Sequence, residues 1–474
     1  MAKFNTTATN KTVNNSGHTA YKMKDKEKLV TQVLTSFFNE KKFYGDNSAD
    51  MQKTIQSVVK TDPKFIANLA VFARREFNMR SVSHILIAYL AHEVEGKPFT
   101  RKAVKAATLR GDDVTEIMAC YLSLFGKPIP NALKKGINDA IQGFDEYTLA
   151  KYKGNGNAVK MRDLLCLCRP TPKSKEQSEM WKRLLNDELE TPYTWETELS
   201  AKGNNKETWE SLIESGKVGY MALLRNLRNI LKVNPSNVDK VLDTLQDPER
   251  VKKSKQLPFR YLSAYKELEN IGGSRVFDTL ENAVEASIEN MPKLAGTTVI
   301  AVDVSGSMSD TISAKSKVQC FEIAMLLGLI ANKICDNSYF YVFNSVIEKY
   351  AVSHRSGILS TVLNSRCGGG TNMALPFDKM ITDKVNADRV IIISDNECNS
   401  GWRAPVQAIA DKYRRFTGND IWVHAIDLQG YGTQQFCGAK TNVIAGWSEK
   451  VFEFIKLAEQ GEGNLEKTIQ NYTY

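Results

Sequence analysis

The sequence predicts a two-part protein, in which a long series of paired α-helices precedes an α/β domain built on a parallel sheet. Through residues 25–294 apolar side chains recur at three- and four-residue spacing, which places one apolar stripe on each helix. From Leu294 onward the pattern changes to short β-branched and aromatic runs that alternate with helical segments. A chain of 474 residues is long enough for more than one core.

The first part follows a polar arm, residues 1–24, that is rich in Asn and Thr and resembles an extended strand. Helix breaks such as Lys97-Pro98 and Lys127-Pro128 separate the apolar stripes. A pair spacing of roughly 30–45 residues favours a degenerate α-solenoid with HEAT-like repeats, and an irregular bundle is the alternative. The expected helices, interrupted by a charged stretch at 172–190, span 26–43, 48–60, 62–77, 80–95, 99–109, 112–125, 129–142, 145–152, 158–168, 206–214, 218–232, 236–245, 249–253, 258–269 and 273–290.

The second part, residues 295–474, has the order of a Rossmann-like domain. Buried strands separated by helices indicate a parallel sheet that is covered on both faces, and ligands of such sheets bind beyond the carboxyl ends of the strands. The expected strands are Thr298–Val302, Tyr339–Phe343, Arg389–Ile393 and Ile421–Ile426, with helices at 315–334, 373–383, 402–416 and 448–459.

Charge is unevenly divided between the two parts. Of the formal net charge of +9, residues 295–474 contribute 17 Lys and Arg against 18 Asp and Glu, which leaves about +10 on residues 1–294. This asymmetry favours a polyanionic partner for the helical part, although surplus surface lysine for solubility explains it too. The opening residues MAKFNTTATNKTVNN have no apolar stretch behind a basic start, and no apolar run reaches membrane-spanning length, so we expect neither export nor membrane insertion.

The eight cysteines are scattered without zinc-like spacing, which fits a reduced, cytoplasmic setting. Cys166 and Cys168 could form half of a metal site, but two buried thiols on a helix face are the simpler interpretation.

A candidate metal site follows the first strand of the second part. Asp303, Ser305 and Ser307 place one carboxylate and two hydroxyls at alternate positions of a turn, and Gly306 lets the backbone fold around them. Thr371 ends a run of three glycines, and Asp395 follows a strand that should lie beside the first. Five oxygen donors favour Mg²⁺ or Mn²⁺ over Zn²⁺.

Two other interpretations of these residues are weaker. The Asp303 segment alone could be an ordinary strand-end turn that Asp and Ser cap. A serine nucleophile would need a base, but GxSxG is absent and His424, in the middle of a strand, is the nearest candidate by residue type. A single metal without a convergent acid or base does not suffice for hydrolysis, so we expect no enzyme.

The runs AVDVSGSM, GGGTNMALP and IIISDNE resemble the von Willebrand factor A-type (vWA) fold with its metal-ion-dependent adhesion site, or MIDAS. Together with PVQAIADKYRRF, and with MRDLLCLCRP, YMALLRNLRNIL and LPFRYLSAY upstream, they resemble the Ro autoantigen family and its TROVE module, in a bacterial or phage-like form. This resemblance covers most of residues 25–474. It implies a helical-repeat ring, residues 25–294, that the vWA domain closes.

The resemblance also implies function: binding of small noncoding Y RNAs outside the ring and of single-stranded ends of misfolded RNAs in its hole. It points to a monomer without membrane attachment that takes part in RNA quality control with an exoribonuclease such as a polynucleotide phosphorylase. By chemistry, the candidates for phosphate contact are Lys151, Lys153, Lys160, Arg162, Arg169, Arg225 and Arg228. Arg169 stands where family members have a histidine, which keeps a donor but removes a group that titrates near neutrality.

A second function remains open from the sequence. The vWA domain could be a metal-dependent protein–protein adhesion module, with the helices as a spacer. The basic first part and the LLRNLRNIL helix argue for RNA instead.

Overall fold

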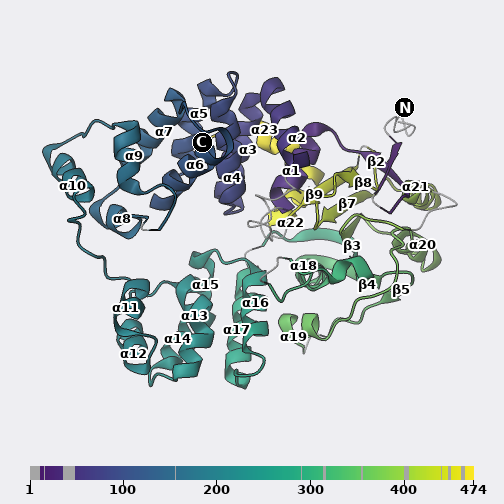
Figure 1. Cartoon of the computed structure of the whole chain (residues 1–474). Coiled ribbons are helices and arrows are strands. Elements are labelled where there is room, and N and C mark those ends of the chain that lie inside the picture. Colours follow the sequence, from purple (N-terminus) through teal and green to yellow (C-terminus); the bar gives the residue numbers. More distant parts are fainter. Residues whose placement is uncertain are drawn as a thin grey trace. The chain divides into compact units, whose positions relative to one another are not determined.

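A computed structural model describes residues 11–14, 16–35, 49–154, 156–289, 291–312, 316–353, 356–399, 405–438, 440–446, 450–460 and 465–474. The chain divides into two compact units (Figure 1). Unit 1 comprises Met1–Lys24 and Glu198–Asn464, and unit 2 comprises Asp25–Thr197 and Leu465–Tyr474. The structure confirms the expected combination of helical repeats with an α/β sheet domain.

Unit 2 is helical, and its helices pack on neighbours one or two elements away along the chain, as α3 does on α4 and α5 does on α7. Local signals set their ends: Asp62 caps α3 by accepting from the Phe65 amide, and Pro63 occupies the first helical position. The helices are α1 (Asp25–Thr35), α2 (Ala49–Thr61), α3 (Pro63–Glu76), α4 (Ser81–His92), α5 (Lys97–Ala107), α6 (Gly111–Phe125), α7 (Asn131–Ile141), α8 (Glu146–Lys151), α9 (Met161–Cys168), α10 (Lys175–Leu185) and α23 (Leu465–Gln470).

A buried ion network joins three of these helices. The carboxylate of Asp113 on α6 accepts from Arg74 Nη2 of α3 at 2.9 Å and lies 3.2 Å from His84 Nε2 of α4. It also accepts from Arg80 Nε and from the amides of Leu109 and Arg110. Because every lone-pair direction of this carboxylate has a donor, its charge is tolerated without solvent.

Six helices of unit 1 precede its sheet. They are α12 (Lys206–Glu214), α13 (Tyr220–Val233), α14 (Val238–Gln246), α15 (Pro248–Ser254), α16 (Pro258–Leu268) and α17 (Ser274–Ile288), and α11 (Trp195–Lys202) crosses the division between the units. Lys266 of α16 forms an ion pair of 2.6 Å with Glu322, which lies in the first turn of the helix that follows β3 in the sheet domain. Glu281 of α17 accepts from the amides of Leu359 and Ser360. These contacts join the last helical repeats to the sheet domain.

The sheet of unit 1 has the strand order β5-β4-β3-β6-β7-β9. Its strands are β3 (Leu294–Asp303), β4 (Cys335–Phe343), β5 (Ile347–Lys349), β6 (Arg389–Ser394), β7 (Trp422–Asp427) and β9 (Thr441–Ala445). All neighbours are parallel except β4 and β5. The chain runs from β3 to β4 on one side and later to β6 on the other, so the carboxyl ends of β3 and β6 flank a topological switch point, where such sheets bind ligands.

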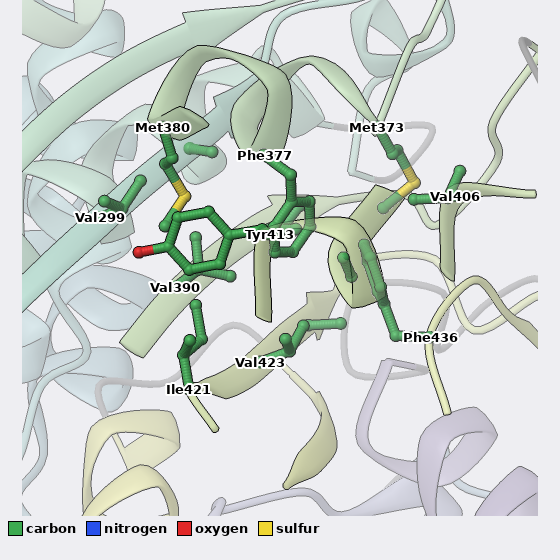
Figure 2. Packing of buried hydrophobic residues seen from close by; sticks show 14 of the residues in the cluster. Val299, Met373, Phe377, Met380, Val390, Val406, Tyr413, Ile421, Val423 and Phe436 are labelled. Carbon is green, nitrogen blue, oxygen red and sulfur yellow. The ribbon is translucent and has the colours of Figure 1, made fainter. Parts of the chain in front are cut away.

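Helices cover both faces of the sheet. On one face, α20 (Leu375–Thr382) and α21 (Val406–Thr417) bury Phe377 and Tyr413 among strand residues such as Val390 (Figure 2). On the other face, α18 (Cys320–Ile334) packs on β3, β4 and β6. Gly328 allows this approach, because a Cβ there would lie 2.6 Å from Val302 Cγ2. The remaining helices of this domain are α19 (Ile358–Leu363) and α22 (Lys450–Glu459).

The described part of the N-terminal arm is a hairpin of β1 (Lys11–Val13) and β2 (Thr19–Lys22), and β2 pairs with β8 (Thr433–Gln434). Several elements were not expected from the sequence: the helices α10, α11, α19 and α23 and the strands β5, β8 and β9. The charged stretch at 172–190 contains α10, whose apolar face is narrow, with Trp181 and Leu184 buried. The expected helices at 26–43, 48–60, 273–290, 315–334, 402–416 and 448–459 fall partly outside the described residues.

Within the described ranges, none of the helices is both long enough and apolar enough to cross a membrane. Cys168 is buried as expected, but Cys166 is exposed, because side chains two positions apart on a helix point in different directions. The expectation of two buried thiols is therefore wrong for Cys166. The expected domain boundary near residue 294 and the closure of a ring stay predictions.

Candidate cation site and basic surface

Asp303 is the last residue of β3, and its side chain is fully buried. One carboxylate oxygen accepts from the Ser305 amide at 2.9 Å, and the other accepts from the hydroxyl of Ser394 on β6 at 2.6 Å. The hydroxyls of Ser305 and Ser307 are 3.3 Å apart. The structure therefore gathers these three sequence candidates at the carboxyl ends of β3 and β6.

Backbone hydrogen bonds fasten the glycine-rich loop to this turn. Gly306 donates to the Gly369 carbonyl at 2.9 Å, and Gly368 donates to the Val304 carbonyl at 2.8 Å. Gly369 has a φ of +79°, a conformation that costs other residues energy. The loop that carries Thr371 is thus held beside the Asp303 turn.

Thr371 and Asp395 come from neighbouring loops that contact each other. The Thr371 amide donates to Asn399 Oδ1 at 2.8 Å, and the Asn399 amide donates back to the Thr371 carbonyl. Asp395 directly follows β6, is 1% exposed and accepts from the Glu397 amide, and the Ser307 hydroxyl partly offsets the rise that burial causes in its pKa. All five candidate metal ligands therefore lie on connected loops at one edge of the sheet.

The electrostatics of this edge favour a cation. Burial and the negative charge of Asp395 raise the pKa of Asp303 to about 7, and burial also raises the pKa of Asp395. Neither Asp303 nor Asp395 forms a salt bridge with a described residue. Two buried carboxylates and three hydroxyls form an oxygen donor set that suits Mg²⁺ or Mn²⁺, so the residues present fit a hard divalent cation.

The N-terminal hairpin contributes contacts that the sequence did not reveal. Asn14 Nδ2 donates to the carbonyl of Cys398 at 2.7 Å, and the Ser16 amide donates to Glu397 at 3.2 Å. Both acceptors belong to the loop that begins with Asp395. The hairpin therefore holds this loop in place, through pairings more than 380 positions apart that no local pattern indicates.

The structure does not make His424 a catalytic base. His424 is fully buried in β7, with Nε2 3.0 Å from Glu459 and Nδ1 3.4 Å from Asn442. The two carboxylate oxygens of Glu459 in turn accept hydrogen bonds from Nε and Nη2 of Arg389. The imidazole belongs to a packed polar cluster, and its described partners do not include the serines of the candidate site.

Several cations proposed for RNA contact gather around α8 and α9 in unit 2. Lys151 is exposed, with its ammonium 5.6 Å from the Tyr147 ring centroid and 5.7 Å from that of Tyr152. Arg162 is an exposed residue of α9, and Arg169 is the exposed left-handed residue that ends it. Lys160, the residue before α9, is half-buried. We call Lys151, Lys160, Arg162 and Arg169 the α8–α9 basic surface, of which Lys151, Arg162 and Arg169 are exposed.

Lys153 differs from its neighbours, because it forms an ion pair with Asp187 at 3.1 Å and donates to the Leu189 carbonyl. Lys134 of α7 was missed by sequence reasoning. It is half-buried on a helix that packs on α9, and its positive charge partly opposes the burial that raises the pKa of Cys168. Only the fold brings a residue 34 positions upstream of Cys168 to this place.

The remaining two candidates, Arg225 and Arg228, are exposed on α13 in unit 1. Arg228 forms an ion pair of 3.0 Å with Glu267. An exposed pair of this kind is weak and would exchange readily for a phosphate.

Comparisons with known proteins give the family. The family model of the TROVE domain matches residues 11–187 and 182–319, and that of the Ro60 vWA domain matches residues 297–426. A crystal structure of the Deinococcus radiodurans RO (RSR) protein is similar with a TM-score of 0.60 at 18% identity, over 86% of this chain and 93% of that chain. This likeness shows a shared fold.

Curated relatives match over parts of their length. Telomerase protein component 1 of Rattus norvegicus is 24% identical over 328 residues, which cover 51% of this chain and 12% of that protein. RNA-binding protein RO60 of Caenorhabditis elegans is 27% identical over 244 residues, covering 48% of this chain and 38% of the relative. The RO60 protein of Deinococcus radiodurans is 26% identical over 219 residues, covering 42% and 41%. The chain thus spans less than half the length of these relatives.

Proposed function

We propose that this chain, which belongs to the TROVE-domain family of Ro proteins, is an RNA-binding protein whose helical part holds the phosphate backbone. The observation that carries the proposal is that the exposed cations of the α8–α9 basic surface lie inside the segment that matches the TROVE domain. Two relatives have names that describe them as RNA-binding. Cations at such a surface release counterions from RNA, which gives affinity with a steep dependence on salt.

The proposed ligands are small noncoding, Y-like RNAs and the single-stranded ends of misfolded or structured RNAs. The chain would act as a noncatalytic scaffold in ribonucleoproteins and in RNA quality control. The proposed setting is a cytoplasmic monomer whose helical repeats and vWA domain close a ring, with an exoribonuclease as a protein partner. The resemblance to Ro proteins and the basic first part of the chain support this proposal.

For the sheet domain we propose a divalent cation, Mg²⁺ or Mn²⁺, held by Asp303, Ser305, Ser307, Thr371 and Asp395. The connected loops and the two buried carboxylates support this proposal. When bound, the cation supplies positive charge that offsets the repulsion between these carboxylates, and an open coordination position for an outside carboxylate. The residues of this chain position the loops and exclude water from Asp303.

The test is binding of the purified chain to a structured RNA with a single-stranded 3′ tail, beside the same RNA without its tail, over a salt titration. Replacing Lys151, Arg162 and Arg169 by Gln should reduce affinity and flatten the slope of log K against log salt by about 0.7–0.9 per lost phosphate contact. A matched control that removes the same number of charges replaces Lys53, Lys60 and Lys64, exposed residues of α2 and α3 in the same unit, by Gln.

The outcomes separate the two candidate functions. Equal affinity and slope for the triple variant, the control and the unaltered chain would contradict the α8–α9 basic surface as the site. Failure of the unaltered chain to bind either RNA at low salt would favour the alternative, a metal-dependent adhesion module that binds an acidic side chain of a protein partner.

A further inference from the structure

We propose that Tyr147 is a stacking platform for an unpaired base of single-stranded RNA, and that Lys151 and Arg110 hold phosphates next to that base. The inference rests on the proposed RNA-binding function and deepens it, because it names the form of RNA that binds beside the α8–α9 basic surface. It arises from an exposed aromatic ring to which the proposed phosphate contacts assign no role.

Tyr147 is 49% exposed on α8. It lies four positions before Lys151 on this helix, so the two side chains share one face. A single exposed apolar side chain is common on protein surfaces and indicates nothing by itself. The groups around this ring therefore decide whether it has a function.

Two aromatic rings and two cations alternate at this place. The Lys151 ammonium lies 5.6 Å from the ring centroid of Tyr147 and 5.7 Å from that of Tyr152. The guanidinium carbon of Arg110 lies 5.4 Å from the Tyr152 centroid. Cations at such distances are attracted to aromatic rings. A surface that combines ring faces with positive charges matches a nucleic acid strand, which alternates bases with phosphates.

Close packing of two helices creates this arrangement. Gly111 begins α6, and a Cβ added to it would lie 2.7 Å from Thr148 Cγ2 and 2.7 Å from Tyr152 Cδ2. The start of α6 therefore lies directly against α8, and this contact brings Arg110 to the Tyr152 ring. The cluster is a product of the fold, since Arg110 and Tyr152 are far apart in the sequence.

The neighbouring carboxylates have partners of their own, which leaves the cations available. Asp145 caps α8 by accepting from a backbone amide, and Glu146 accepts two hydrogen bonds of 2.7 Å from an arginine of α10. Among the described ion pairs, none involves Lys151. Arg110 pairs with Asp112 at 3.0 Å, but its side chain is 47% exposed, and such a pair is weak enough to exchange for a phosphate.

The exposed ring favours a single strand over a duplex. Bases of a duplex are stacked on one another, so a duplex would use the charge of Lys151 and leave the Tyr147 ring unused. An unpaired base can lie on the ring, and every base has a face that can do so. We therefore expect this site to accept single strands with little dependence on their sequence.

The test measures binding of the full chain by fluorescence anisotropy, with two labelled probes. One is an oligouridylate, which forms no structure of its own, and the other is the same sugar–phosphate chain without bases. The variants are Tyr147→Ala, which removes the ring, and Tyr147→Phe, which keeps it. The matched control is Phe416→Ala, which removes an aromatic ring that is 55% exposed on α21 in unit 1. Circular dichroism checks that each variant is folded.

We expect Tyr147→Ala to bind the oligouridylate about 5–150-fold more weakly than the unaltered chain, the usual effect of losing one stacked base. The slope of log K against log salt should stay the same, because no charge is removed. Its affinity for the chain without bases should not change. Tyr147→Phe and Phe416→Ala should match the unaltered chain with both probes.

Four results would overturn the stacking role and leave general RNA binding in place. They are equal affinity of Tyr147→Ala and the unaltered chain, an equal loss with both probes, an equal loss in Tyr147→Phe, and equal affinity of the unaltered chain for both probes. The second would mean that the ring only positions Lys151. The fourth decides the matter even if Tyr147→Ala does not fold. If the unaltered chain binds no RNA, tailed or untailed, the proposed function fails and this inference fails with it.

Discussion

Replacing Asp113 by Asn should be among the most destabilising single changes in unit 2. The change removes the charge opposite Arg74, whose side chain is 4% exposed, while Asp113 itself is fully buried. An amide also presents only one oxygen where the carboxylate accepts from Arg74, Arg80, His84 and two backbone amides. Breaking a buried pair by neutralising one partner costs about 3–5 kcal/mol.

Urea unfolding followed by far-ultraviolet circular dichroism measures this loss. Asp139→Asn is the matched control, because Asp139 makes a two-bond pair with Arg101, whose side chain is 56% exposed. An exposed pair contributes at most about 1 kcal/mol, so the control should stay close to the unaltered chain. If Asp113→Asn lost no more stability than the control, the buried network would not stabilise the helical repeats as described.

Three further changes test other parts of the structure. Gly328→Ala should lower the unfolding temperature of unit 1, because the new Cβ would lie 2.6 Å from Val302 Cγ2. This clash should outweigh the gain of about 1 kcal/mol in helix propensity. A variant with a higher unfolding temperature would contradict the close packing of α18. Burial opposes ionisation of Glu459, but hydrogen bonds from His424 and Arg389 lower its pKa to about 2, so its stabilising contribution is complete above 4.5 and disappears as pH falls toward 2. The excess stability of the unaltered chain over Glu459→Gln, measured by urea unfolding, should shrink across that pH range; a constant difference would refute the ion pair. Asp303→Ala should abolish stabilisation by Mg²⁺ in thermal unfolding while leaving RNA affinity unchanged in a gel-shift assay, and loss of RNA binding with the fold intact would contradict the separation of the two sites.

The sequence predicted the fold class because its two periodicities are strong. The sequence also indicated that the five oxygen donors lie at one edge of the sheet. The strands could be recognised from their apolar runs, and the carboxyl ends of parallel strands share an edge. The sequence did not predict helix α10, because only two of its side chains, Trp181 and Leu184, are buried. Its apolar stripe is therefore too narrow to be recognised among charged residues.

Other features depend on contacts that no local pattern indicates. Asp427 ends a clear strand, but only the structure reveals that its second carboxylate oxygen has no hydrogen-bond partner among the described residues. In the sequence Lys153 resembles the exposed cations near it. In the structure its ammonium forms an ion pair with Asp187, which lies 34 positions away. The hairpin that holds the Asp395 loop through Asn14 depends on a contact across 384 positions. Pairings of this range are set by tertiary packing, which single-sequence patterns do not contain.

The most direct test of the central claim is the affinity of the unaltered chain for tailed and untailed RNA between about 50 and 200 mM salt, the range over which several phosphate contacts change affinity by orders of magnitude. We expect tight binding at low salt that weakens steeply and is stronger for the tailed RNA. Absence of binding to both RNAs at the lowest salt would contradict an RNA-binding function for this chain.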